Sequence, residues 1–425
     1  MRAKLLLAAI LISTVCSAQR TLIHCGSLID GKNKELLKQV TLVVEGNKIT
    51  SVDKGFTQPA KDDKLIDLSK KTVMPGLIDM HVHLEGETSK DGMVKRFTQN
   101  EADVAFQSTV YAKKTLLAGF TTVRDCGGSG VNIALRNAIN AGIVTGPRVY
   151  TAGKAIASTG GHGDPTNGYR KDLMGDPGAK EGVINSPEDA RKAVRQRYKD
   201  GADFIKITAT GGVLSVAKDG SGPQFTQEEV NAIVETAKDY GMITAAHAHG
   251  AEGMKRAVLA GITTIEHGTL MTEEVMDLMK QKGTYYVPTI IAGRSAAEYA
   301  KIPGYYHPLV VPKALAIGPK IQDNFGKAYK HGVKIAFGTD AGVYPHGDNA
   351  KELGYMVEAG MPAIEALLSA MQVNANILGW GDKVGSLEKG KLADIIAVDE
   401  DPTKNIATML KVSFVMKDGA VYKNE

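Results

Sequence analysis

The chain has 425 residues, of which 43% are hydrophobic and 23% charged, and its formal net charge is +4 at neutral pH. This composition is ordinary for a soluble globular protein with a large core. A charge so small over this length leaves nucleic-acid binding without compositional support.

The N-terminus has the pattern of a secretory signal peptide. Arg2 and Lys4 precede an apolar run over residues 5–15, and small residues follow as far as Ala18. We expect cleavage after Ala18, so that residues 1–18 are a signal peptide and the protein is exported to the periplasm or secreted. The run is too short to span a membrane comfortably, and no other stretch of about 18 apolar residues follows. The alternatives are a buried first helix and a retained anchor, including a lipid anchor at Cys16.

Both ends of the mature chain are rich in short β segments. Apolar and polar residues alternate over segments that turn residues separate, before residue 70 and again after residue 390. The segments are Thr21–His24, Val40–Val44, Ile49–Val52, Ala393–Val398, Val412–Lys417 and Ala420–Tyr422. We therefore predict a small composite β-sandwich domain made of residues 19–72 and 386–425.

Residues 73–385 alternate β and α segments at a regular spacing. Amphipathic stretches such as Glu101–Leu117 and Gln227–Tyr240 separate the apolar strand candidates. The eight predicted strands are Met74–Leu84, Thr121–Cys126, Val149–Ala152, Phe204–Ala209, Ile243–Ala248, Thr263–His267, Tyr285–Ile290 and Ile335–Asp340. Eight such units predict an α/β fold of the (β/α)8 TIM-barrel type. A doubly wound open sheet is the second possibility, weakened because no Gly-rich phosphate motif follows the first strand.

Side chains that are able to bind metals gather where these strands end. His81 and His83 end the first strand, and their period-two spacing places both on one face. Barrels of this kind carry their active sites at the carboxyl ends of the strands. The residues concerned are His81, His83, Lys206, His247, His267 and Asp340. Any one of them alone is more often structural, but together they predict a metal-dependent active site.

Lys206 lies among β-branched residues in the fourth predicted strand, where burying an ammonium is costly. An ion pair with Asp203 or Asp340 is one solution. In the other, the neutral amine reacts with carbon dioxide to form a carbamate, whose two oxygens bridge two cations. Neutral imidazoles suit zinc and similar ions, and carboxylates suit harder divalent metals. We therefore expect two divalent metal ions, with zinc as the first choice, and N6-carboxylation of Lys206.

These motifs resemble the amidohydrolase superfamily over essentially the whole mature chain. The segments that carry the resemblance are Met74–His83, Ile265–Gly268, Gly338–Gly342 and Gly385–Asp394. The segments most similar to the imidazolonepropionase-like, prolidase-like branch of dipeptidases and carboxypeptidases are Ser158–Asp164, Thr210–Val213, Ala246–Gly250 and Gly342–Gly347. The resemblance implies a hydrolase that cleaves an amide or peptide bond in a dipeptide, an Xaa-Pro substrate or an N-acyl amino acid.

The resemblance also implies roles for the metal-binding residues. His81 and His83 would bind the more buried metal together with Asp340. The carboxylated lysine would bridge to a second metal, held by the histidines that end the fifth and sixth strands. His249, two residues after the fifth-strand ligand, is the alternative ligand from that strand.

The expected mechanism is attack on the scissile carbonyl by a metal-bridging hydroxide. Asp340 would take the proton and deliver it to the leaving nitrogen. His162, in a Gly-rich loop after the third strand, would stabilise the oxyanion, or would be a turn residue without substrate contact. Candidate substrate contacts are His162, Tyr344, His346 and Arg124. Arg124 is otherwise a structural partner of Asp125.

Three other functions are compatible with parts of this pattern. A mononuclear deaminase needs no bridging lysine and usually has a Glu shortly after the fifth-strand histidine, where this chain has Ala248, His249 and Gly250. A cyclic-amide hydrolase of the imidazolonepropionase type shares the binuclear centre. A non-catalytic metal-binding barrel would not need the proton shuttle at Asp340. The partners expected are a small-molecule or dipeptide substrate and a second copy of the chain in a homo-oligomer, with no nucleic acid and no stable membrane span.

Overall fold

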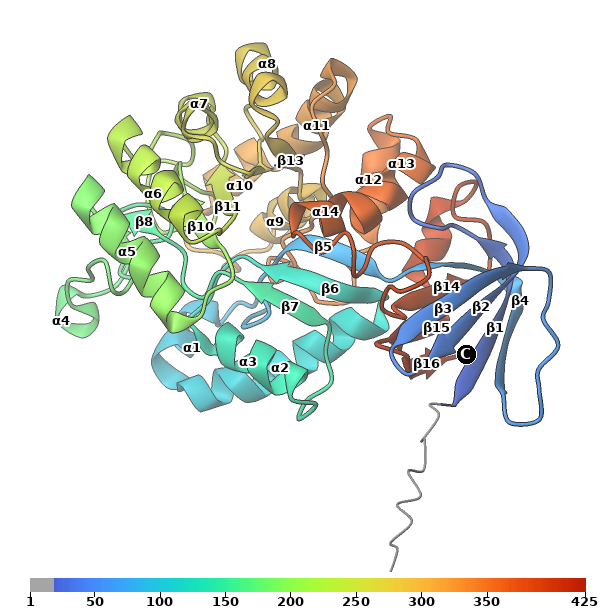
Figure 1. Ribbon diagram of the computed structural model, residues 1–425. Coiled ribbons are helices and arrows are strands. Elements are labelled where there is room, and N and C mark those ends of the chain that lie inside the picture. Colours follow the sequence, from blue (N-terminus) through green and yellow to red (C-terminus); the bar gives the residue numbers. More distant parts are fainter. Residues whose placement is uncertain (1–18) are drawn as a thin grey trace, which may run out of the picture.

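The computed structural model describes residues 19–425, so the signal peptide predicted for residues 1–18 lies outside the described part. The described residues form an α/β barrel with a β-rich domain at its side (Figure 1). The predicted combination of a TIM barrel and a β domain built from both termini is confirmed. In that part of the chain, no helix is both long enough and apolar enough to cross a membrane.

The barrel contains two parallel sheets with the strand orders β5-β6-β7 and β10-β11-β12-β13. These strands are β5 (Leu77–Val82), β6 (Phe120–Asp125), β7 (Arg148–Thr151), β10 (Ile205–Thr208), β11 (Thr244–Ala248), β12 (Thr264–His267) and β13 (Tyr285–Val287). Isolated bridges connect the sheets and bring in the eighth segment, pairing Ile156 with Ile207, Tyr286 with Ile335, and Val82 with Ala341. The predicted eighth strand therefore closes the barrel without forming a regular strand, and its last residue, Asp340, has a left-handed backbone with φ 62°.

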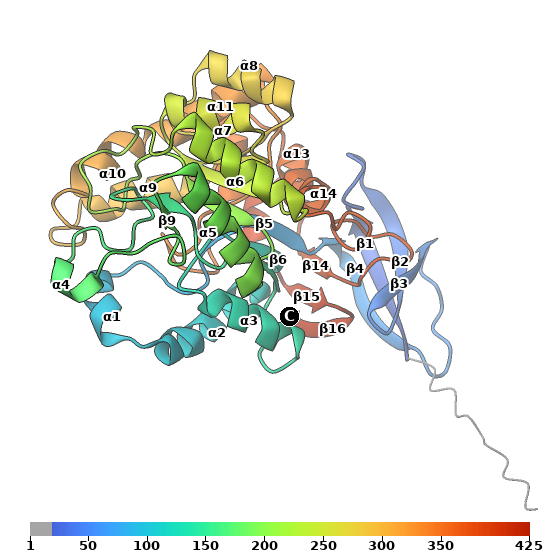
Figure 2. The same ribbon diagram turned by 60° about the vertical axis from the view of Figure 1, so that its left-hand side comes forward.

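Helices cover the outside of the barrel in both views (Figures 1 and 2). They are α2 (Glu101–Leu117), α3 (Val131–Asn140), α5 (Pro187–Asp200), α6 (Gln227–Asp239), α7 (Ala251–Ala260), α8 (Glu273–Lys282), α11 (Lys320–His331), α12 (Lys351–Glu358) and α13 (Ala363–Leu368). Two of these helices begin at capping residues: Ser186 accepts the N–H of Asp189 at 3.1 Å, and Thr226 and Glu229 form a capping box. After α13 a π-helical turn (Ser369–Val373) leads into α14 (Asn374–Ile377).

Further helices and strands occupy the loops that follow the barrel strands. They are α1 (Gly92–Thr98), β8 (Ala157–Ser158), α4 (Lys171–Met174), β9 (Val183–Ile184), α9 (Ile290–Ala300) and α10 (Val311–Ile317). The predicted strand Tyr285–Ile290 is too long, because Thr289 has φ 52° and the chain turns there into α9. These loops surround the carboxyl ends of the strands, where a barrel carries its active site.

The β domain is one mixed sheet with the strand order β16-β15-β14-β4-β1-β2-β3. Its strands are β1 (Arg20–Leu28), β2 (Leu37–Glu45), β3 (Lys48–Lys54), β4 (Lys64–Pro75), β14 (Ile395–Val398), β15 (Phe414–Lys417) and β16 (Ala420–Asn424), with a 3-10 turn at Ile406–Leu410. The C-terminal strands join the N-terminal ones through the antiparallel pair of β14 and β4. Arg148 of β7 ties the sheet to the barrel through ion pairs with Asp394 at 2.8 Å and Asp418 at 2.6 Å.

Candidate active site

The six side chains predicted to bind metal come together at the carboxyl end of the barrel. His81 has a central position, since its Nε2 atom is 3.5 Å from Asp340 Oδ1 and 3.2 Å from Lys206 Nζ. His83 Nε2 lies 3.3 Å from the same oxygen of Asp340. Lys206 and Asp340, which are far from His81 in the chain, thus meet at its ring because the barrel brings the ends of their strands together.

His247 on β11 and His267 on β12 complete the cluster. Their ring centroids are 4.6 Å apart, and the His267 ring is 5.1 Å from that of His81. One ligand atom each from His81, His267 and Asp340 lies within 4.8 Å of the others. This spacing of nitrogen and oxygen donors is compatible with shared divalent cations.

His247 of β11 and His249, which follows the end of that strand, both face the cluster. The His249 ring stacks on His267 at 5.0 Å, and its Nδ1 atom is 2.9 Å from Thr269 Oγ1. His247 Nε2 is 3.2 Å from the carbonyl oxygen of Gly211. The period-two spacing that made His249 the alternative ligand therefore holds in the structure.

Left-handed backbone conformations occur at three residues of the site that are not glycine. His267, Thr289 and Asp340 have φ values of 72°, 52° and 62°. Such conformations cost about 1–3 kcal/mol each and persist where the surrounding structure enforces them. At His267 the turn breaks strand alternation, so that both Glu266 and His267 reach His81. A 2.7 Å contact between His267 Nδ1 and Thr289 Oγ1 holds the ring in place.

The carboxylate of Glu266 orients the His81 ring. The sequence pattern had assigned no role to this residue. Its Oε2 atom is 2.8 Å from His81 Nδ1, and its Oε1 atom accepts a 2.7 Å hydrogen bond from Arg124. Burial raises the pKa of Glu266, but Arg124 and His81 lower it more, to about 2. The ionised carboxylate therefore accepts the Nδ1 proton of His81 and leaves the Nε2 lone pair facing the cluster. The signal for this role in the sequence was an acidic residue inside a segment predicted to be a barrel strand.

The structure buries three of the residues that were predicted to contact the substrate. Arg124 is fully buried, and its guanidinium donates hydrogen bonds to Glu266, to Thr264 and to the carbonyl oxygen of Met80. Tyr344 is 1% exposed and packs in the barrel core. His346 is buried and stacked on Tyr111, with its Nε2 atom 2.9 Å from the carbonyl oxygen of Gly86. The sequence showed their closeness to strand ends but not the direction of their side chains.

His162, by contrast, lies at the site. Its ring stacks on that of His247 with centroids 4.2 Å apart, and its Nδ1 atom is buried without a hydrogen-bond partner. Gln224 holds the loop by accepting the His162 backbone N–H at 2.7 Å. Burial and the neighbouring His249 lower the pKa of His162 to about 3, so the ring is neutral and has one N–H to donate.

Burial keeps four more imidazoles of the site neutral, whereas at His83 burial lowers the pKa but Asp340 raises it more. It lowers the pKa of His81 and of His249 to about 4, and Lys206 adds to the effect at His81. Burial also lowers the pKa values of His247 and His267 well below the ordinary range. Neutral rings keep a lone pair, which is the form of histidine that binds metal.

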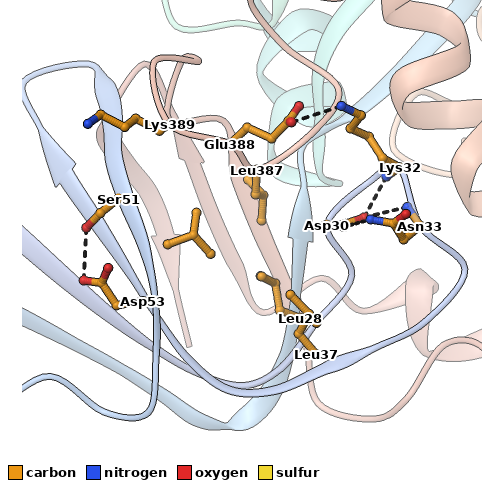
Figure 3. Close-up of a pocket in the computed structure, with 11 residues that line it drawn as sticks. Leu28, Asp30, Lys32, Asn33, Leu37, Ser51, Asp53, Leu387, Glu388 and Lys389 are labelled. Atoms are coloured by element: carbon orange, nitrogen blue, oxygen red, sulfur yellow. Dashed lines mark hydrogen bonds and ion pairs between the residues drawn. The ribbon is translucent and has the colours of Figure 1, made fainter.

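A separate concavity lies on the β domain between β1, β3 and the segment around Leu387 (Figure 3). Several of its charged groups already have partners: Lys32 pairs with Glu388 at 3.0 Å, and Asp30 accepts the backbone N–H of Lys32 and of Asn33. It brings together none of the predicted ligands, and we assign it no chemistry.

Comparisons with known proteins agree with this geometry. The model of the amidohydrolase family matches residues 72–422. A crystal structure of a Xaa-Pro dipeptidase with methionine bound in its active site is 54% identical, with a TM-score of 0.93 over 96% of this chain and 100% of that chain. The structure of a prolidase in complex with N-methylphosphonate-L-proline is 30% identical, with a TM-score of 0.84 and the same coverage. Ochratoxinase of Aspergillus niger is 32% identical over 97% of this chain and 89% of its own length.

Proposed function

The chain belongs to the amidohydrolase family and hydrolyses amide bonds of small substrates, and we propose that it is a binuclear, metal-dependent dipeptidase. The similarity that carries the substrate proposal is the 54% identity to a Xaa-Pro dipeptidase whose active site holds methionine. A dipeptide, Xaa-Pro among the first to test, or an N-acyl amino acid would provide the amide bond. The released amino acid would leave with a free carboxylate.

The residues of the site fit two divalent cations. Lys206 is 4% exposed, and within residues 19–425 no carboxylate lies within 4.0 Å of its Nζ atom. Asp203, one ion-pair partner considered for it, is bound instead by Arg136 at 2.7 Å. An ammonium facing His81 Nε2 with no anion is unfavourable, whereas a carbamate at that place would be a ligand. We propose zinc ions, held by His81, His83, Lys206 as its carbamate, His247, His267 and Asp340.

When bound, two such ions lower the pKa of a water molecule and polarise the scissile carbonyl. Asp340 lies 3.3 Å from His83 and is ionised: burial raises its pKa, but His81 and His83 lower it more. Its carboxylate would accept the proton of the attacking water and pass it to the leaving nitrogen. The neutral His162 would donate its N–H to the carbonyl oxygen as negative charge develops there.

Metal content and dipeptide hydrolysis test this proposal together. We expect about two equivalents of metal in the wild type, and loss of bound metal and of activity in Lys206→Ala. Lys282→Ala, an exposed lysine at the end of α8, is the matched control. One equivalent or none, with activity retained in Lys206→Ala, would overturn the binuclear centre and favour the mononuclear alternative.

We propose export as well, because of the charge and apolar pattern of residues 1–18. N-terminal sequencing of the protein from a bacterial host would test it. Gln19 as the first residue, in the periplasmic or secreted fraction, is expected, and an intact N-terminus in the cytoplasmic fraction would contradict the proposal.

A further inference from the structure

Lys313 of α10 is a buried ammonium that has no acidic partner. Its residue is 8% exposed, and its Nζ atom donates to the carbonyl oxygens of Gly212 at 2.8 Å and Ser215 at 2.7 Å. Within residues 19–425 no carboxylate lies within 4.0 Å of that nitrogen. Burial lowers the pKa of Lys313, and the charge of the nearby Asp219 offsets only part of that effect, since its carboxylate lies beyond 4.0 Å and accepts backbone N–H groups of its own loop, from Ser221 and Gly222.

The ammonium lies beside the active site, and the backbone of Gly212 lies between it and the His162 ring. A Cβ atom on Gly212 would fall 2.2 Å from His162 Nδ1, so the backbone that accepts from Lys313 is in contact with that ring. On the other side, the carbonyl oxygen of Gly211 faces His247 Nε2. The positive charge of Lys313 also contributes to the lowered pKa values of His162 and His249, after burial as the main cause.

This arrangement leaves one N–H of Lys313 without an acceptor and its positive charge only partly compensated by Asp219. An ammonium has three donors, and the two carbonyl oxygens occupy two of them. Carbonyl dipoles satisfy hydrogen bonds but do not neutralise a buried charge, which is costly without a counter-ion. An anion that arrives with the substrate would supply both the third acceptor and the missing negative charge.

We propose that Lys313 binds the α-carboxylate of the substrate's C-terminal residue, so that the enzyme requires a free carboxyl terminus. The proposal rests on the proposed dipeptidase function, since a dipeptide or an N-acyl amino acid has its carboxylate next to the scissile amide. Lys313 takes the place of Arg124, Tyr344 and His346, which the sequence suggested as substrate contacts. A second effect is that the carboxylate would strengthen the link between α10 and the loop carrying Gly212 and Ser215.

Binding of L-methionine and L-methioninamide, measured by calorimetry on the metal-loaded protein, tests this role without catalysis. The two probes differ at the carboxyl group, and the pH is chosen so that both amines are protonated. We expect the wild type to bind the amino acid about tenfold to a hundredfold more tightly than the amide, the range of one charge-assisted hydrogen bond. Lys313→Met should lose that preference, whereas Lys320→Met, an exposed lysine on α11, should keep it.

Equal binding of the two probes by the wild type would overturn the proposal, as would a preference that Lys313→Met retains. Weaker binding of both probes to the same degree would show that Lys313 only fastens the loop, which also overturns it. If Lys313→Met fails to fold, Lys313→Gln removes the charge and keeps a donor for the loop carbonyls, and it should lose the preference too. Hydrolysis of dipeptides is scored separately: a carboxylate preference without cleavage would refute the dipeptidase, and cleavage without the preference would refute only Lys313.

Discussion

Replacing Glu266 by Gln should test how far this carboxylate orients His81, because the substitution removes none of the predicted metal ligands. The carboxylate accepts from His81 and from Arg124, and both the Glu266 and Arg124 side chains are 0% exposed. An amide of the same shape has one oxygen and one NH2 group. If the NH2 group faces Arg124, two donors oppose each other. If it faces His81, the imidazole must carry its proton on Nε2, the atom directed at Lys206 and Asp340, and can no longer act as a ligand.

The size of the effect follows from the burial of the pair. Breaking a buried ion pair from one side costs about 3–5 kcal/mol, and loss of a hydrogen-bonded partner of a ligating histidine weakens metal binding about 10–100-fold. We therefore expect Glu266→Gln to unfold at a lower temperature and to lose metal to a competing chelator. Adding Arg124→Met removes the unpaired guanidinium, so part of the stability should return while metal affinity stays low.

The assay is a chelator titration followed by metal analysis, together with thermal unfolding in the absence of metal. Glu274→Gln is the control, since that glutamate is exposed on α8 and pairs with Lys255 at the surface. Wild-type metal affinity in Glu266→Gln would refute the reasoning, because His81 would then be held correctly without the carboxylate. Restored metal affinity in the double variant would also contradict it.

Three further predictions concern individual residues. Gly212→Ala should displace the His162 ring, since the new Cβ atom would lie 2.2 Å from its Nδ1 atom. Loss of the oxyanion contact should then lower kcat about 10²–10³-fold. An unchanged kcat would exclude this role for His162. Burial raises the pKa of Glu352 to about 8 from an ordinary 4.5, so its contribution to stability is complete below pH 4.5 and is lost as the pH rises to 8. Urea unfolding should show the free energy of unfolding falling over this range by up to about 1.4 kcal/mol per pH unit, and Glu352→Gln should reduce the slope. Burial also raises the pKa values of the Cys25 and Cys126 thiols to about 12, so a thiol reagent at pH 8 should modify them only after denaturation, and fast labelling of the native protein would contradict their burial.

Much of the fold could be predicted from hydrophobic periodicity. Helix α2 was predicted at its observed bounds, Glu101–Leu117, and the start of α6 at Gln227, because a capping residue and an apolar stripe are both local signals. The path of the eighth strand was harder to predict. This segment pairs with β13 and β5 only by isolated bridges, and hydrophobic periodicity contains no signal for such an irregular path.

The sequence by itself determined which residues are available for metal chemistry. His81, His83 and Asp340 were recognised at strand ends because period-two spacing and parallel strands place such side chains at one edge. The tertiary structure decided what each side chain contacts. Glu266 and Lys313 are ordinary charged residues in the sequence, and only the folded chain encloses one under His81 and the other beside His162. Arg124 shows the converse: its place at the end of β6 suggested a substrate contact, but its side chain turns into the barrel, since burial of a charge depends on partners supplied by distant strands.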